Sequence, residues 1–268
     1  MTTLTSDSTP ASAGAPVPGP LRVSVIVPVM DETASLRETV RRVMEENRPD
    51  IHEVICVVSR FTTPGALAVC REMEGEFSGV VWTLLQQKPY LGGALQDAFQ
   101  AATGSHILLM ASDLETPPQD AKNIIAEARR GWGIVATTRW RQGGGFSGYN
   151  PVKFIANWIF QKAIGTLYST SLSDLTFGYR IWRAEILRDQ PWRELRHPFL
   201  LECLLRPLLN GATATELPVF WEPRREGESH NPFWRNFLYF RIAFQLRFAH
   251  SQKQSAQPIS VESTGAHQ

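Results

Sequence analysis

A chain of 268 residues with 27 basic and 26 acidic side chains has a formal net charge of only +1 and no long basic run, which excludes nucleic acid as the expected partner. Hydrophobic residues at 43% and charged residues at 20% are ordinary for a globular protein of one large or two small domains. Cys56, Cys70 and Cys203 form no CxxC pair, which excludes a zinc knuckle or a disulfide framework and favours a reducing cytoplasm.

The two ends of the chain differ from the middle in composition. Residues 1–20 are rich in Ser, Thr, Ala and Pro and predict a disordered tail, and we expect the same of 251–268. The N-terminus lacks the basic start and apolar core of a secretory leader, and no segment reaches 18 uninterrupted apolar residues. We therefore expect a protein of the cytoplasm without a membrane-spanning helix.

Strands and helices alternate through the first half of the chain. Apolar runs predict strands at 23–28, 53–58, 80–85, 107–111 and 133–138. A capping box at 35–38 and helical spacing of apolar residues up to 44 predict the first helix. Helices are also expected at 64–74, from a Gly92–Gly93 turn to about 102, and at 118–130. This order predicts an α/β fold, with a mostly parallel sheet covered by helices on both faces.

The pattern changes after Arg139. We expect a flexible loop at 143–145, a helix at 151–167, an extended segment at 174–182 and a helix at 198–209. A strand at 214–221, a polar loop at 224–230 and a final helix at 231–250 complete the chain. Glu202 is an acid on an otherwise apolar helix, and we expect it to be buried beside an arginine.

The final helix is apolar on more than one side. A stripe of five phenylalanines, flanked by Arg241 and Arg247, lies across from a second apolar row. The stripe is Phe233, Phe237, Phe240, Phe244 and Phe248, and the second row is Leu238, Ile242 and Leu246. Such a helix packs against the core or a twin subunit, or lies among lipid head groups. Both interpretations stay open from the sequence.

Two carboxylates, Asp113 and Glu115, follow the strand at 107–111. Ligands of open α/β sheets bind beyond the carboxyl ends of the strands, where these acids stand. If the chain stays extended, both side chains project to one side and could hold Mg²⁺ or Mn²⁺ against a phosphorylated ligand. The alternative is that both acids only cap the helix entered at Pro117.

Five further motifs stand in a fixed order. They are Pro28-Val-Met-Asp-Glu32 after the first strand, Ala111-Ser-Asp-Leu-Glu-Thr-Pro-Pro118, Thr138-Arg139 followed by Gly143-Gly144, Ser173-Asp-Leu-Thr-Phe-Gly-Tyr-Arg180, and Arg224-Arg-Glu-Gly-Glu-Ser-His230. From about Arg22 to Asn231, their order and spacing resemble the family-2 glycosyltransferases of the GT-A fold, and most of all the dolichyl-phosphate (polyprenyl-phosphate) mannosyltransferase branch. No GxGxxG follows the first strand, so a dinucleotide-binding oxidoreductase is poorly supported.

The resemblance implies a GT-A domain over 21–230, a divalent cation (Mg²⁺ or Mn²⁺), a nucleotide-sugar donor, and a role for each matching residue. Asp113, Asp174 and Arg180 would be catalytic, and Asp113 and Glu115 would hold the metal. The donor would contact Pro28, Val29, Asp31, Glu32, Gly92, Asp113, Arg224, Ser229 and His230. The acceptor would contact Arg139, Lys153, Asn157, Thr176 and Arg180.

The sequence also departs from the pattern of that branch. Ala111 replaces the first Asp of the metal motif, Glu115 its Gln, and His230 the Lys of the last loop. Ser59-Arg60 stands where the family has Asp-Asp beside the nucleobase, so the base is not predicted. Lys153 and Asn157 stand in place of an Arg and a Ser.

Three functional interpretations follow. The first is an inverting transfer to a polyprenyl-phosphate acceptor at the cytoplasmic membrane face, with 231–250 as a peripheral membrane contact or a homo-oligomer interface. An ionised phosphate acceptor needs cations rather than a strong base, whereas a hydroxyl acceptor would need Asp174 or Glu115 as base. The second is transfer to a soluble or natural-product acceptor, and the third a degenerate, non-catalytic sugar-nucleotide-binding protein.

Overall fold

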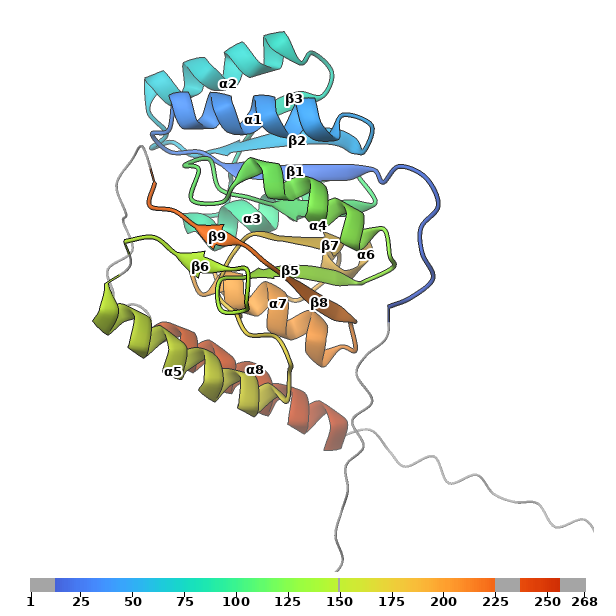
Figure 1. The fold of residues 1–268 in the computed structure, drawn as a ribbon, viewed down its shortest axis with the longest axis vertical. Helices are drawn as coiled ribbons and strands as arrows, with labels where there is room; N and C mark the ends of the chain where they lie inside the picture. The colour runs from blue at the N-terminus through green and yellow to red at the C-terminus, as the bar shows by residue number, and fades with distance from the viewer. Residues whose placement is uncertain (1–12, 149, 225–236, 256–268) are drawn as a thin grey trace, which may run out of the picture.

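A seven-stranded sheet forms the centre of the molecule in the computed structural model, which describes residues 13–148, 150–224 and 237–255 (Figure 1). Its strand order is β3-β2-β1-β4-β7-β5-β8. The strands are β1 (Val23–Pro28), β2 (Ile51–Val58), β3 (Val81–Leu85), β4 (His106–Leu109), β5 (Ile134–Thr138), β7 (Arg180–Arg183) and β8 (Ala214–Pro218). Two short strands, β6 (Gly145–Phe146) and β9 (Phe220–Trp221), pair beside it. The predicted α/β fold is confirmed.

Helices cover both faces of this sheet, and two separate cores result. The helices are α1 (Ala34–Asn47), α2 (Pro64–Glu76), α3 (Tyr90–Ala101), the 3₁₀ turn η1 (Pro118–Asp120), α4 (Ala121–Ala128), α5 (Pro151–Tyr168), α6 (Ala184–Leu187), α7 (Phe199–Leu209) and α8 (Phe237–Ser255). One core packs α1, α2 and α4 against side chains such as Val25 and Tyr179. The other packs α3, α5, α7 and α8 against Ile26 and Trp182, which point to the opposite face.

Strand β7 runs antiparallel between β4 and β5, while the other pairings in the sheet are parallel. Arg180, the first residue of β7, is opposite Leu109 near the end of β4 and Ala136 in β5. The start of β7 therefore lies at the edge where β1, β4 and β5 end. This reversal carries the segment 173–180 to the edge where ligands of α/β sheets bind.

The helices α5 and α8 lie side by side at the periphery of the molecule (Figure 1). Tyr239, Ile242, Ala243 and Leu246 of α8 are buried in the second core, whereas Phe244 and Phe248 are 46% and 62% exposed. The core side of the predicted helix is therefore confirmed from Phe237 on, and residues 231–236, Phe233 among them, lie outside the described residues. No helix in the described ranges is long and apolar enough to cross a bilayer.

Several predicted boundaries were wrong. Gly92 and Gly93 are not a turn but lie within the first turn of α3, and Ser35 lies inside α1, which begins after Thr33. Only 180–183 of the expected extended segment is a strand, and the strand expected at 214–221 divides into β8 and β9. The N-terminal tail was expected to extend too far, to residue 20, since residues 14 and 17 form backbone hydrogen bonds with 131 and 129. The last helix, α8, continues to Ser255 instead of ending at 250.

Candidate active site

The loop that follows β4 is held in place by hydrogen bonds of three buried side chains, Ser112, Thr116 and Tyr179. The Ser112 hydroxyl donates to the Pro28 carbonyl at 2.7 Å, and the Thr116 hydroxyl accepts the backbone N–H of Ala111 at 3.1 Å. The Tyr179 hydroxyl, at the end of the segment before β7, donates to the Pro117 carbonyl at 3.1 Å. These three bonds fix the loop 111–117 that carries the two predicted metal ligands.

Asp113 and Glu115 converge on the side chain of Arg224. Arg224 Nη2 lies 3.3 Å from Asp113 Oδ2, and its Nε donates to Glu115 Oε1 at 2.9 Å. The chain between the acids is not extended, because Leu114 adopts a left-handed φ of +63° and Asp113 Oδ1 accepts the Glu115 N–H at 3.0 Å. The capping alternative was wrong as well, since Pro117 is the residue before η1 and neither acid caps it.

Electrostatics in this loop oppose ionisation of Asp113. Burial raises its pKa to about 6, and the negative charge of Glu115 adds to the effect, whereas Arg224 acts in the other direction. Glu32 contributes a third negative charge, and its carboxylate is fixed by the backbone N–H groups of Met30 and Asp31. The site thus concentrates three carboxylates around one guanidinium, which is a setting that attracts cations.

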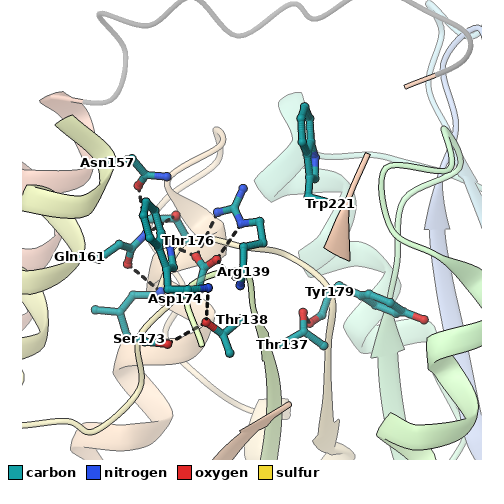
Figure 2. A network of polar contacts seen from close by, with 12 residues as sticks. Thr137, Thr138, Arg139, Asn157, Gln161, Ser173, Asp174, Thr176, Tyr179 and Trp221 are labelled. Carbon is teal, nitrogen blue, oxygen red and sulfur yellow. Dashed lines mark hydrogen bonds and ion pairs between the residues drawn. The ribbon is translucent and has the colours of Figure 1, made fainter. Parts of the chain in front are cut away.

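A second polar cluster lies around Asp174, whose side chain is fully buried (Figure 2). Arg139, just after β5, donates Nε to Oδ2 at 2.7 Å and Nη2 to Oδ1 at 3.1 Å. Gln161 of α5 donates to Asp174 Oδ1 at 3.3 Å and to Thr176 Oγ1 at 2.9 Å, and accepts the Leu175 N–H at 2.8 Å. Gln161 also donates to Asn157 Oδ1 at 3.1 Å, so one amide joins three predicted site residues.

A cavity of about 610 Å³ opens beside this cluster. Arg139 is among the residues that line it, and its guanidinium lies over the rings of Phe146 and Phe177, at 5.0 and 4.4 Å from their centroids. Trp140, Phe146 and Phe154 line the cavity as an aromatic triad with centroid separations of 4.8 to 5.4 Å. Arg141 also lines it, with half of its side chain exposed, and pairs with the buried Glu216.

Arg180 is fully buried and does not face the cavity. Its Nη1 and Nη2 donate to the carbonyls of Leu200 and Leu175 at 2.7 and 2.8 Å. The direct contact with an acceptor that the resemblance implied is therefore not present in this structure, because a side chain without exposed surface contacts only protein. Glu202 is buried beside Arg206, as expected.

The other predicted site residues are spread around this edge. Val29 is buried, and Gly92 packs against α7 and the segment before it: a Cβ there would lie 2.7 Å from Phe199 Cβ. Lys153 is exposed in the first turn of α5. Ser229 and His230 lie outside the described residues. Gln161, Arg141 and Glu216 also belong to this cluster and cavity but were not predicted from the sequence. Of the three, Glu216 carries a signal, because an acid within a strand is seldom buried without a partner.

The glycosyltransferase family-2 profile, described as Glycosyl transferase family 2, matches residues 24–190, which contain both acids of the loop and the Arg139–Asp174 pair. The chain belongs to glycosyl transferase family 2. Membership makes it a glycosyltransferase, and the predicted family is confirmed, while the polyprenyl-phosphate branch is not.

Solved structures share the fold of this family-2 glycosyltransferase. Glucosyl-3-phosphoglycerate synthase from Mycobacterium tuberculosis, in complex with Mn²⁺, UDP and glucosyl-3-phosphoglycerate, aligns with a TM-score of 0.62 at 15% identity, over 90% of this chain and 82% of that one. The same enzyme with Mg²⁺ and UDP gives 0.60 at 16% identity, over 90% and 81%. Its complex with Mn²⁺, UDP-glucose and glycerol 3-phosphate gives 0.62 at 15% identity, over 90% and 82%. At this identity the likeness establishes the GT-A fold.

Proposed function

We propose that this glycosyltransferase moves a sugar, with inversion, from a nucleotide-sugar donor to a lipid phosphate at a membrane surface. The observation that carries the acceptor class is the exposed face of α5. Val152, Ile155, Trp158 and Ile159 are 48 to 72% exposed there. Phe154, on the same helix, is 38% exposed and also lines the cavity, so the apolar face continues into the cavity wall.

The charges of this face favour an anionic lipid surface. The helices α5 and α8 contain no Asp or Glu, while Lys153, Lys162 and Arg241 are exposed on them. Exposed apolar side chains, an exposed Trp and basic residues are the composition of helices that lie in lipid head groups. The face therefore suits the peripheral membrane contact that the sequence suggested for 231–250, with α5 as the larger contributor.

The lining of the cavity favours a phosphate over a hydroxyl as the nucleophile. Its described lining contains arginines and aromatic rings but no Asp, Glu or His that could act as a general base. Asp174 is buried and paired with Arg139, and Glu115 with Arg224. An acceptor already ionised at neutral pH needs only cations such as Arg141 and Lys153 to hold it in line, with Arg139 and Asp174 as positioning residues.

On the donor side, Asp113 and Glu115 would hold Mg²⁺ or Mn²⁺, and Arg224 would meet the diphosphate. Two carboxylates fit such an ion, because Mg²⁺ is commonly held by one or two carboxylates together with substrate phosphates. The cation neutralises charge on the departing diphosphate. The solved structures of the mycobacterial synthase contain Mn²⁺ or Mg²⁺ with UDP, which supports this assignment.

Two experiments test the proposal. A thermal-shift panel of nucleoside diphosphates and nucleotide sugars, with and without Mn²⁺, identifies the donor, because a ligand that binds the native state raises the melting temperature. Transfer of labelled sugar is then measured to polyprenyl phosphate in anionic vesicles and to small soluble phosphates. We expect vesicle binding and lipid product, both lost in Ile155→Ser/Ile159→Ser and retained in Leu85→Ser, whose side chain is equally exposed on β3.

Efficient transfer to a small phosphate, with no vesicle binding, would favour the soluble-acceptor alternative. The mycobacterial synthase structures, which contain phosphoglyceric acid or glycerol 3-phosphate, are the observation behind that alternative. Nucleotide binding without transfer to either kind of acceptor would instead favour the non-catalytic sugar-nucleotide-binding alternative.

A further inference from the structure

Arg224 pairs with both of the acids, Asp113 and Glu115, that would hold a divalent cation in the proposed donor site. One guanidinium uses Nη2 for Asp113 Oδ2 at 3.3 Å and Nε for Glu115 Oε1 at 2.9 Å. The same loop fixes both carboxylates in this convergent arrangement, through the left-handed Leu114 and the bond from the Glu115 N–H to Asp113 Oδ1. The two carboxylates therefore converge on one positive charge, the guanidinium of Arg224.

The charge at this site explains why an internal cation is useful. The side chains of Asp113 and Glu115 are only 8% and 22% exposed. The negative charge of Glu32 acts on both Asp113 and Arg224. Negative charges that act on one another in this way repel unless a positive charge lies among them. Ala111 stands where the resembling branch has an acid, so Asp113 and Glu115 are the two carboxylates of this loop that can pair with Arg224 or hold a metal ion.

A metal ion and Arg224 cannot use these oxygens together. Asp113 Oδ1 and Glu115 Oε2 already accept the N–H groups of Glu115 and Trp221, so a metal ion would compete with Arg224 for Asp113 Oδ2 and Glu115 Oε1. A guanidinium held against a divalent cation would also be repelled by it. Entry of a metal would therefore require that Arg224 leave the two acids, and the released guanidinium would be available to the diphosphate of the donor. Arginine suits that second contact because its planar fork matches phosphate oxygens.

We infer that Arg224 is a resident counter-ion that competes with the divalent cation for Asp113 and Glu115, and that cation entry transfers Arg224 from the two acids to the donor diphosphate. The inference rests on the proposed donor site. It makes Arg224 a residue with opposite effects on two ligands: it weakens binding of the metal alone and strengthens binding of the nucleotide.

The test measures Mn²⁺ affinity without nucleotide, by titration calorimetry, in the wild type, Arg224→Gln and Arg224→Lys. Arg42→Gln is the matched control, because Arg42 also forms an ion pair with a glutamate, on the surface of α1. We expect Arg224→Gln to bind Mn²⁺ about tenfold more tightly, since a charge-assisted pair is removed, with a smaller gain for Arg224→Lys. Equal or weaker Mn²⁺ binding by a folded Arg224→Gln overturns the inference.

The second measurement separates this inference from the proposed function. With saturating Mn²⁺, we expect Arg224→Gln to bind nucleoside diphosphate at least about tenfold more weakly than wild type, because the displaced guanidinium is missing. Unchanged nucleotide affinity overturns the transfer of Arg224 to the diphosphate. If no nucleotide binds the wild type, the proposed donor site fails, while the gain in Mn²⁺ affinity still supports the competition. Tryptophan fluorescence gives an independent measure of metal entry, because Trp221 Nε1 lies 3.4 Å from Glu115 Oε2. We expect Mn²⁺ to change the fluorescence of the wild type, and the part of that change that comes from Trp221 to be missing in Trp221→Phe.

Discussion

Single side chains determine how this site is held, and Gln161 is the clearest case. Its amide contacts four groups: the side chains of Asn157, Asp174 and Thr176 and the backbone of Leu175. Gln161 also joins α5, which carries the exposed apolar face, to the segment that leads into β7. No sequence pattern marks it, since a glutamine on a helix is ordinary until its partners, distant in sequence, are known.

Replacing Gln161 by methionine should destabilise the protein. The substitution keeps the length of the side chain but leaves the Leu175 N–H without its partner, which costs about 1–3 kcal/mol for a buried group. It also removes one of the two hydrogen bonds to Asp174 Oδ1, which keeps the bond from Arg139. Urea unfolding followed by circular dichroism measures the change. Lys162→Met, one residue along and exposed, serves as control and should stay within about 0.5 kcal/mol. Equal effects of the two variants would contradict the role of Gln161.

Asp113 makes a second prediction at this scale, in stability against pH. Its pKa is raised to about 6 in the folded protein, from 3.8, so its ionised form destabilises the fold above pH 6, and that cost disappears as the pH falls to 4. Asp113→Asn should therefore raise the free energy of unfolding at pH 7.5 by about 1–3 kcal/mol without metal, and abolish glycosyl transfer.

The measurement is urea unfolding in EDTA from pH 4 to 7.5, with Glu45→Gln, exposed on α1, as control. A stabilisation of Asp113→Asn that grows toward low pH would have the wrong sign and refute the assignment. Asp113, predicted from the sequence as a metal ligand, would in that case be an ordinary structural residue.

Whole elements followed the sequence more closely than single contacts did. The apolar runs predicted the strands β1 to β5 to within a few residues, because buried parallel strands are continuously apolar. Of the segment 174–182, expected to be extended, only 180–182 belongs to a strand, and 174–179 is held by contacts with Arg139 and Gln161 rather than by a strand partner. The Gly92–Gly93 pair was wrongly taken for a turn because a pair of glycines more often breaks a helix than begins one.

Helix packing gives Gly92 its own prediction. A Cβ at Gly92 would lie 2.7 Å from both the Phe199 Cβ and the Leu195 carbonyl carbon, so Gly92→Ala should separate α3 from α7 and cost about 1–3 kcal/mol. Gly75 lies in α2, and a methyl group added there would have no described atom within 4 Å, so Gly75→Ala should stabilise by about 0.5–1 kcal/mol. Melting temperatures of the two variants should move in opposite directions; movement in the same direction would contradict the tight α3–α7 contact.

Across the whole molecule, the buried His106 should add to acid sensitivity, while the raised pKa of Asp113 acts in the opposite direction over the same pH range. His106 in β4 has its pKa lowered to about 4, first by burial and then by the charge of Arg183, and its Nε2 has no partner among the described residues. The unfolded chain takes up the proton near pH 6.5, before the folded protein does, so stability is lost as the pH falls from 6.5 to 4.

His106→Phe should remove up to about 3 kcal/mol of that loss. The measurement is the urea midpoint at pH 7, 6, 5 and 4, compared with His52→Gln, a change at a partly exposed histidine of β2. An unchanged slope in His106→Phe would mean that other groups govern the acid transition.

The reversed strand β7 also governs when the sheet can be completed. In the sheet, β5 has β7 and β8 as its two neighbours, and both are synthesised after it. A chain growing on the ribosome can therefore assemble β3, β2, β1 and β4 as soon as they emerge, while β5 waits for residues 180–183. Asp174, in the segment before β7, reaches the edge that carries the acids after β4 only when β7 inserts, so the complete candidate site forms later than the β3-β2-β1-β4 part of the sheet.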